Sequence, residues 1–426
     1  MEMLRKFFPI ALLVTAISFT SCDDDDGGDN NGGGGGNGTL AEQAEASGNI
    51  VTSDSSSTGA TSLEDLFNED FSEGNSWAVG TSYQGLFAEG ELTAEEIEEA
   101  KDGGNVKSGA ITADETWSGV VILDGAVFVD ENVTLTIEAG TKVVAISDGT
   151  IDYLLVRQGG VINAIGTAEE VIVFTAVDDE NNDGTYEAPT RGDFGGLLLN
   201  GRASINNGDS NGEAAAEVDV DEAYGGSDDA DNSGTLQYIR IEYSGNQIDP
   251  ETEHNGLTLN GVGNGTKIDH IQIFQGRDDG IEFFGGTVEM SDIVVIGSGD
   301  DQVDWTFGWR GTITNLLAIV AEDGGHRGIE GDNQNENNAA TPFSEPSITN
   351  VTLIDLNEGA DNDENEAVLL RVGTKGVIEN LRTEGFKTGI RIVNDQTLLN
   401  VIDDDLNVES SINDDADNMT IFEGDS

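Results

Sequence analysis

The sequence predicts an all-β solenoid in which short strands stack as successive rungs. Four segments begin with Gly-Thr and run into an Ile/Val-rich stretch, at residues 234–245, 265–276, 286–297 and from 311 onward. A repeat of this length with an apolar run and a closing Gly is typical of rungs that bury one face against the next. The composition agrees, because 57 Gly and only 5 Pro suit short strands between tight turns.

Other all-β folds fit these repeats less well. Turns recur every five to eight residues in the segment from Gly109, as in rungs of three short parallel strands. A propeller or a sandwich would favour antiparallel hairpins and longer, more regular repeats. We also expect no helix of any length beyond residue 110.

The charge is strongly acidic, with 83 Asp and Glu residues against 18 Lys and Arg residues and a net charge of -65. Such a surface repels nucleic acid and anionic lipid, so nucleic acid is not an expected partner. A polyanionic partner would need divalent cations as mediators. The alternative is a solvated acidic coat, as in proteins from saline habitats.

Residues 1–22 have the features of a secretory signal. Arg5 and Lys6 precede a short apolar stretch over 7–19, which is too short to span a bilayer as a helix. Cys22, the single cysteine, follows at the place where lipoprotein signals are cut and lipidated. We therefore expect lipidation at Cys22 and no intramolecular disulfide.

The sequence around Cys22 resembles the looser lipobox of Bacteroidetes, since Phe19 and Ser21 replace the commonest residues. The acidic run 23–26 resembles the export tag that sends such lipoproteins to the outer face of the outer membrane. This resemblance implies a cell-surface protein anchored in outer-membrane lipid. The Gly/Asn/Asp-rich residues 23–38 would then form a flexible tether.

Residues 39–108 have weak periodicity and are expected to be poorly structured or to form an N-terminal cap over the first rung. One helix is predicted there, because Thr93 and Glu96 have the spacing of a capping box. The β-helix domain is predicted over 109–426.

A family resemblance supports this architecture. The stretches ITADETWSG, GGSDDADNSGTLQYIRIEYSG and DDGIEFFGGTVEMSDIVVIGSGDDQVDWTFGW resemble a group of Bacteroidetes surface lipoproteins, over about residues 108–395. The resemblance implies a right-handed parallel β-helix of the pectin-lyase type. It implies the fold and location more firmly than a reaction.

Three successive rungs carry ionisable groups just before a strand. Stacking would align Asp279, Asp301 and His326 along one edge, with Asp300 beside them. Paired carboxylates with a histidine suit glycoside hydrolysis, and the motifs are similar to those of polygalacturonases, although the family's Asn-Thr-Asp is missing. The alternative is that these Asp side chains accept backbone N–H groups at rung turns.

Two loops suggest calcium. Alternating oxygen ligands followed by Gly suit a hard cation, although the usual Glu at the twelfth position is Thr190. The candidate ligands are Asp179, Asn181, Asp183 and Glu187 in the first loop, and Asp229 and Asp231 in the second.

Aromatic residues recur on consecutive rungs. Trp305 and Trp309, with Arg327 nearby, could form a platform on which sugar rings stack. Aromatic rings stacked inside the solenoid are the alternative.

The sequence therefore favours a surface-exposed lipoprotein that binds glycan or mediates adhesion, and that could work beside an outer-membrane transporter. The alternative is a polysaccharide hydrolase, or a lyase, that uses Asp279, Asp300 or Asp301, and His326. A spacer without either activity is a third possibility.

Overall fold

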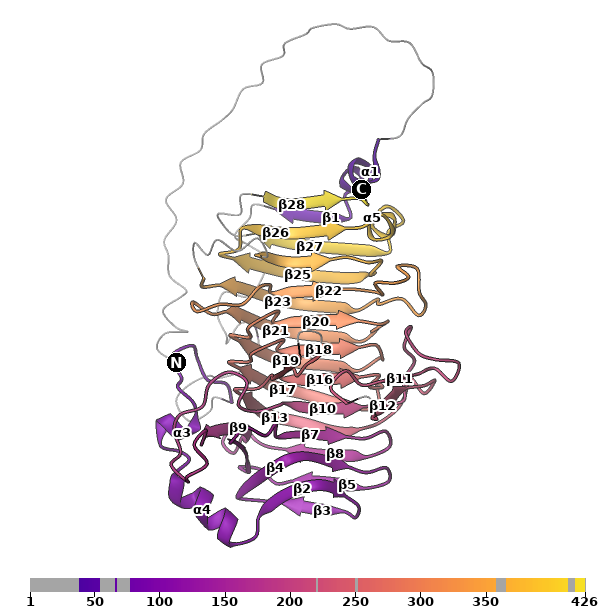
Figure 1. Cartoon of the computed structure of the whole chain (residues 1–426). Helices are drawn as coiled ribbons and strands as arrows, with labels where there is room; N and C mark the ends of the chain where they lie inside the picture. The colour runs from indigo at the N-terminus through magenta and orange to yellow at the C-terminus, as the bar shows by residue number, and fades with distance from the viewer. Residues whose placement is uncertain are drawn as a thin grey trace, which may run out of the picture.

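The computed structural model describes residues 38–53, 66, 77–219, 221–249, 252–357, 365–412 and 418–425. Cys22, the predicted signal and the tether up to residue 37 lie outside these residues. The described chain forms a right-handed parallel β-helix, which confirms the predicted fold class (Figure 1).

The rungs stack their short strands in one column, in which each strand pairs in parallel with the next. These strands are β7 (Tyr153–Val156), β10 (Leu197–Asn200), β16 (Leu257–Asn260), β18 (Ile281–Phe284), β20 (Val303–Thr306), β22 (Ile329–Gly331), β24 (Glu366–Leu370), β26 (Thr388–Val393) and β28 (Asn418–Glu423).

Longer strands form the rest of each rung. They are β13 (Gly234–Glu242), β17 (Lys267–Phe274), β19 (Glu289–Ile296), β21 (Thr312–Val320), β23 (Ser347–Asp355), β25 (Gly376–Glu384) and β27 (Leu406–Ile412). The four Gly-Thr segments lie one above another, because β13 pairs with β17, β17 with β19, and β19 with β21. The stacking predicted from the repeats is confirmed.

The first rungs follow the same path with strands that are divided differently. They are β2 (Val106–Ile111), β3 (Glu115–Trp117), β4 (Val120–Val129), β5 (Thr134–Ile137), β6 (Lys142–Ser147), β8 (Val161–Ile165) and β9 (Ile172–Asp178). Strands β8 and β9 both pair with β13, so the single strand β13 stacks on two separate strands of the rung before it.

Six of the long strands, β13 to β25, each bend at one residue in the left-handed region, and the last four of these residues form a set. The φ angles at this corner are 59° for Asp292, 63° for Asn315, 59° for Asn350 and 56° for Asn380. Asn and Asp tolerate this conformation better than other residues with a side chain. We call these four residues the corner ladder, because each Asn amide donates to the side chain below it, over 2.7, 3.0 and 2.8 Å.

The core lies inside the coil and follows from the alternation of the strands. In β18 and β20 the residues Ile281, Phe283, Val303 and Trp305 point inward and are at most 1% exposed. The ring of Phe283 stacks on Trp309 with a centroid distance of 3.8 Å. Full burial of such side chains contributes about 1.5–3 kcal/mol each.

Two antiparallel hairpins leave the solenoid beside the short strands. They are β11 (Glu213–Ala215) with β12 (Ala223–Gly225), and β14 (Gln247–Asp249) with β15 (Thr252–Glu253). Ala216 and Tyr224 of the first hairpin pack against Phe284 of β18.

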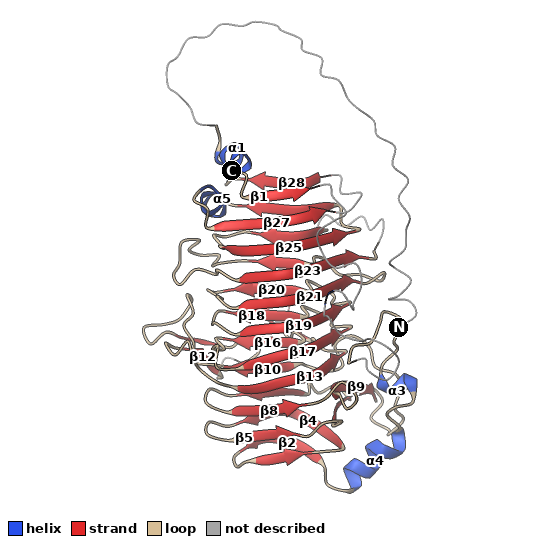
Figure 2. Cartoon of the chain, turned by 180° about the vertical axis from the view of Figure 1, so that it is seen from behind, coloured by secondary structure: helices blue, strands red, loops and turns tan. Residues whose placement is uncertain are grey.

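The described parts of the N-terminal segment lie at both ends of the solenoid. Helix α1 (Leu40–Ser47) and β1 (Ile50–Ser53) lie at the C-terminal end, where β1 pairs with β27 (Figure 2). Helices α3 (Leu86–Glu89) and α4 (Ala94–Asp102) lie at the other end. The segment is therefore more than a cap over the first rung, because its strand β1 pairs with β27 in the last rungs.

The helix predicted from Thr93 is α4, and the capping box with Glu96 is present. The expectation that no helix follows residue 110 is wrong, because helix α5 (Asp395–Ile402) lies between the last rungs. It packs against α1. Its buried Leu398 and Val401 join the core at the end of the coil. Within the described ranges, no helix has the length and apolar run needed to cross a membrane.

Candidate functional site

The candidate site lies where each long strand turns into the next short strand. Val303 pairs with Ile281 and Ile329, so the residues two positions earlier stack as Asp279, Asp301 and Arg327. The predicted column is therefore wrong at its last member. His326 lies over Asp300 instead, because the strand pairing places it one residue out of line with Asp301.

Asp279 and Asp301 each have one carboxylate oxygen committed to the backbone. Asp279 Oδ1 accepts the N–H of Asp301 over 2.9 Å, and Asp301 Oδ1 accepts the N–H of Arg327 over 2.9 Å. Both residues are buried, with 8% and 4% exposure. The alternative explanation of these residues as turn acceptors is therefore confirmed for one oxygen of each.

Sequence reasoning missed a second stack of carboxylates on the outward face of the short strands. Glu282 of β18, Asp304 of β20 and Glu330 of β22 occupy paired positions. The signal was present in the sequence, since each lies between inward residues, as in Ile-Glu-Phe and Val-Asp-Trp.

The two stacks bring acidic groups into three overlapping clusters. The clusters are Asp300, Asp301 and His326; Asp278, Asp279 and Asp300; and Asp279, Glu282 and Asp304. Within each, one possible ligand atom per residue lies within 4.8 Å of the others. We call these seven residues the carboxylate patch.

Burial and mutual repulsion raise the pKa values of five carboxyl groups in the patch. Burial, followed by Asp304, raises the pKa of Asp279 well above its ordinary range. Burial and nearby carboxylates act in the same way on Glu282, Asp301 and Asp304. Burial, Glu253 and Asp300 raise the pKa of Asp278 to about 8. These raised pKa values show that negative charge outweighs positive charge around these carboxyl groups.

Three buried oxygens, one in the patch and two beside it, have no hydrogen-bond partner among the described residues. They are Asp304 Oδ1, Asn255 Oδ1 and Thr258 Oγ1. Thr258 occupies the paired position next to Glu282, and the Asn255 amide donates to Glu282. Because buried polar atoms are seldom left unpaired, these oxygens indicate that a group which accepts oxygen ligands belongs here.

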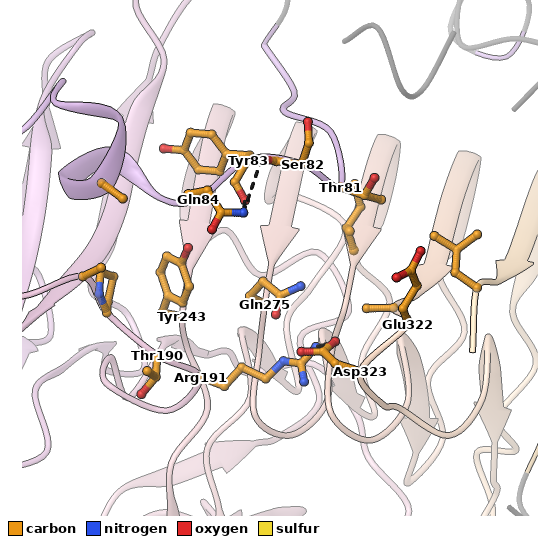
Figure 3. A pocket seen from close by; sticks show the side chains of 16 residues that line it. Thr81, Ser82, Tyr83, Gln84, Thr190, Arg191, Tyr243, Gln275, Glu322 and Asp323 are labelled. Carbon is orange, nitrogen blue, oxygen red and sulfur yellow. Dashed lines mark hydrogen bonds and ion pairs between the residues drawn. The ribbon is translucent and has the colours of Figure 1, made fainter. Parts of the chain in front are cut away.

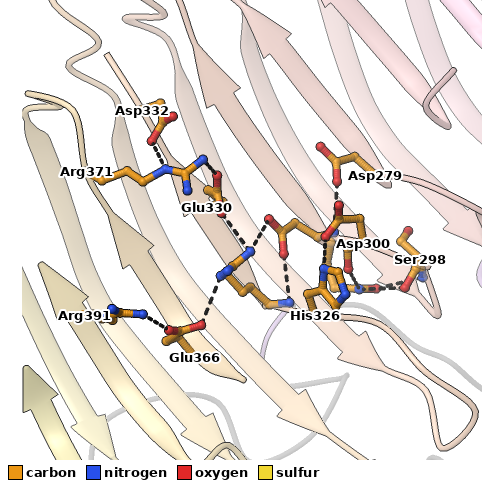
Figure 4. A network of polar contacts seen from close by, with 12 residues as sticks. Asp279, Ser298, Asp300, His326, Glu330, Asp332, Glu366, Arg371 and Arg391 are labelled. Carbon is orange, nitrogen blue, oxygen red and sulfur yellow. Dashed lines mark hydrogen bonds and ion pairs between the residues drawn. The ribbon is translucent and has the colours of Figure 1, made fainter. Parts of the chain in front are cut away.

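Arginines neutralise the other end of the site (Figure 4). Arg327 contacts Glu330 at 2.9 Å, Glu366 at 3.0 Å and Asp301 at 3.5 Å. Arg371 pairs with Glu330 and Asp332. Since Arg327 is only 6% exposed, the prediction that it contacts glycan is wrong.

The pair of Asp300 and His326 is the most accessible part of the patch. His326 Nδ1 contacts Asp300 Oδ1, and the two side chains are 35% and 40% exposed. This pair could exchange a proton with a bound molecule, because an imidazole can both accept and donate a proton.

The predicted aromatic platform is also wrong. Trp305 and Trp309 are 1% and 0% exposed. Their indole N–H groups donate inside the coil, to Thr374 Oγ1 and to the Val288 carbonyl oxygen. Strand alternation directs Trp305 inward, so neither ring can stack on a sugar.

The first predicted calcium loop closes on its own backbone. Asp179 accepts the N–H groups of Asp183 and Gly184, and Asp183 accepts that of Thr185. Asn181 and Glu187 are exposed. Over the described ranges, none of the clusters with three possible His or carboxylate ligands includes this loop.

The second predicted calcium loop is occupied in the same way. Asp229 accepts hydrogen bonds from Ser204 and pairs with Arg310 at 3.2 Å. Asp231 accepts from the Ser233 hydroxyl. The structure brings oxygen ligands together at the carboxylate patch and not at these two loops.

Comparison with known proteins gives one match. A family described as "Pectate-lyase like beta helix domain" matches residues 104–422. No curated protein and no solved structure matches the chain.

Proposed function

The chain belongs to the pectate-lyase-like β-helix family, and on that premise we propose that it binds anionic polysaccharide through divalent cations held by the carboxylate patch. The observation that carries the proposal is the convergence of Asp279, Glu282 and Asp304, where Asp304 Oδ1 and two neighbouring buried oxygens have no partner. Calcium takes six to eight oxygen ligands from carboxylates, amides and hydroxyls, and these are the groups present.

The electrostatics support a cation more than a bare acidic site. Several buried carboxylates in one place repel one another, and this repulsion raises their pKa values. A divalent cation would replace the repulsion by attraction and would satisfy the unpaired oxygens. It would also allow a polyanion to approach a chain with a net charge of -65.

The proposal favours binding over cleavage. One oxygen of Asp279 and one of Asp301 hold the backbone of the next rung, so these groups are poorly placed to move during a reaction. Arg327 is fully engaged by Asp301, Glu330 and Glu366.

Calcium binding and polysaccharide retention test this function together. In calorimetry, the full chain should bind Ca²⁺, and it should be retained on immobilised polygalacturonate with calcium but not with EDTA. Asp304→Asn should weaken calcium binding at least tenfold, which corresponds to about 1.4 kcal/mol. Asp183→Asn is the matched control, since it alters one carboxylate in the first calcium loop.

Three outcomes would overturn the proposal. They are the absence of calcium binding, the loss of calcium binding in Asp183→Asn but not in Asp304→Asn, and equal retention on polygalacturonate with EDTA. Circular dichroism of each variant shows whether the fold is kept.

Polysaccharide hydrolysis is the second candidate function, and one observation favours it. Asp278, with its pKa raised to about 8, would hold a proton at neutral pH beside the exposed pair of Asp300 and His326. A protonated and an ionised carboxyl group are the two parts that glycoside hydrolysis requires. If the wild type releases reducing ends from polygalacturonate and the Asp300→Asn and His326→Ala variants do not, this activity is established. If the wild type releases no reducing ends, the activity is excluded for this polymer.

The cellular location is proposed from the sequence alone. We propose that the chain lies on the outer face of the outer membrane, anchored by a lipid on Cys22, where it works beside a transporter. Labelled fatty acid should enter the wild-type chain but not Cys22→Ser, and equal labelling of both would contradict the anchor.

A further inference from the structure

We infer that a cavity beneath the N-terminal segment is a second binding site, which takes a neutral sugar unit without the help of a cation. The cavity has a volume of about 960 Å³, and ligand sites commonly have about 300–1,000 Å³. This site is separate from the carboxylate patch, so the inference does not rest on the proposed function.

The cavity is built between the N-terminal segment and the rung turns (Figure 3). Residues 81–84 form one wall, and residues 188–191 with 321–323 form the other. Tyr243 and Gln275, each directly beyond the end of a long strand, lie between these walls.

The wall made by the N-terminal segment is firmly attached. The amide of Gln272 pairs with both backbone groups of Val79, over 2.7 and 2.8 Å. Trp77 is 1% exposed and packs in one cluster with Phe274. The Arg240 guanidinium also donates to the Tyr83 hydroxyl over 3.1 Å. The cavity is therefore formed before a ligand arrives, which lowers the entropic cost of binding.

Arg191 provides a hydrogen-bond donor that lacks an acceptor. Its Nη2 pairs with Asp323 Oδ1 at 2.8 Å, but its buried Nε has no partner in the part of the chain that the structure describes. Leaving a buried donor unpaired has a cost in free energy. A ligand oxygen in the cavity would remove this cost.

The charges of the lining favour a neutral ligand. Arg191 contributes one positive charge, while Glu322 and Asp323 contribute two negative charges. An anionic ligand would meet a net negative wall on an already acidic protein, whereas a hydroxyl group can accept from Arg191 and donate to a carboxylate.

The remaining lining residues suit a sugar ring. Hydroxyl and amide groups come from Thr81, Ser82, Gln84, Thr190 and Gln275. Apolar surface comes from Tyr243, Pro189 and Leu356, and aromatic and aliphatic groups pack against the C–H faces of a pyranose. This combination of a few polar groups with apolar walls is typical of small-molecule sites.

The experiment uses the full chain in EDTA, so that binding through cations is removed. Cellotetraose, xylotetraose, mannotetraose and maltotetraose are titrated by calorimetry, with tetragalacturonate as the anionic comparison. One of the neutral tetrasaccharides should bind, and Arg191→Met should weaken that binding at least tenfold. Arg202→Met is the matched control, because Arg202 also pairs with a surface carboxylate, Glu131, at 2.6 Å, but lies outside the cavity.

Four results would overturn the inference. They are no binding by any neutral tetrasaccharide, equal binding by Arg191→Met and wild type, tighter binding of tetragalacturonate, and binding that needs calcium and disappears in Asp304→Asn. Should Arg191→Met fail to fold, Gln275→Asn removes another polar contact while tolerating the φ of 56° at that position, and it should also weaken binding.

Discussion

The corner ladder and the carboxylate patch are both columns of polar side chains, but they solve stacking in opposite ways. In the ladder, Asn315, Asn350 and Asn380 each donate to the residue below. An amide has both a donor and an acceptor, so identical residues can satisfy one another along the column. In the patch, ionised carboxylates can only accept, so Glu282 and Asp304 repel each other at paired positions.

The difference shows how a solenoid separates stability from binding. Repetition stabilises a column of amides, because each added rung brings one more hydrogen bond. Repetition of carboxylates instead accumulates negative charge, which a second component must offset. The ladder is therefore expected to hold the fold, and the patch to hold a ligand.

The largest expected effect comes from breaking the ladder with Asn350→Val. This change removes two side-chain hydrogen bonds and places a β-branched residue at a φ of 59°. The expected loss of stability is about 3 kcal/mol. Thermal unfolding measures it, with Thr349→Val in the same strand as the control, and equal melting temperatures for the two variants would contradict the role of the ladder.

A smaller effect is expected when the ladder is made to resemble the patch, with Asn350→Asp. The ionised side chain still accepts from Asn380, but it cannot donate to Asn315. At pH 7 the loss should be about 1–2 kcal/mol, and at pH 4 it should shrink because a protonated Asp can donate again. Unfolding at both pH values tests this, and a loss that does not change with pH would contradict it.

The third expected effect concerns the pH dependence of stability, and not stability at one pH, in Asp278→Asn. The pKa of Asp278 is raised from 3.8 to about 8 in the folded state, so the folded chain keeps a proton that the unfolded chain releases. Without cations, stability should therefore fall as pH rises from about 4 to about 8. Asp278→Asn should reduce this fall, as measured by melting in EDTA.

Asp404→Asn is the control for this pH dependence, because the Asp404 side chain is exposed. It should leave the fall unchanged, and a fall of the same size in Asp278→Asn as in the wild type would show that Asp278 does not contribute.

The sequence allowed the coil to be predicted because repeated Gly-Thr segments reveal which residues share a position. The same positional logic, applied to the strands, would have found more of the site. Counting back two residues from Ile281, Val303 and Ile329 gives Asp279, Asp301 and Arg327, whereas matching motifs by residue type placed His326 in the column. Residue type suggested the chemistry, but strand pairing decided the neighbours.

Other features depend on contacts that are distant in the sequence. The direction of Trp305 follows from alternation around Asp304 and could have been predicted. The cavity could not, because it requires residues 81–84 to lie across turns near 191, 275 and 323. No local pattern in the N-terminal segment specifies which rungs it crosses.

The pairing of β1 with β27 has a consequence for the order in which the chain is assembled. Residues 50–53 leave the ribosome long before their partners at 408–411 exist. Val408 donates to Asn49 and Ser410 to Val51, so these contacts must wait for the last rungs. Strand β1 is therefore synthesised early but paired late. A chain that ends before β27 would leave β1 without its strand partner.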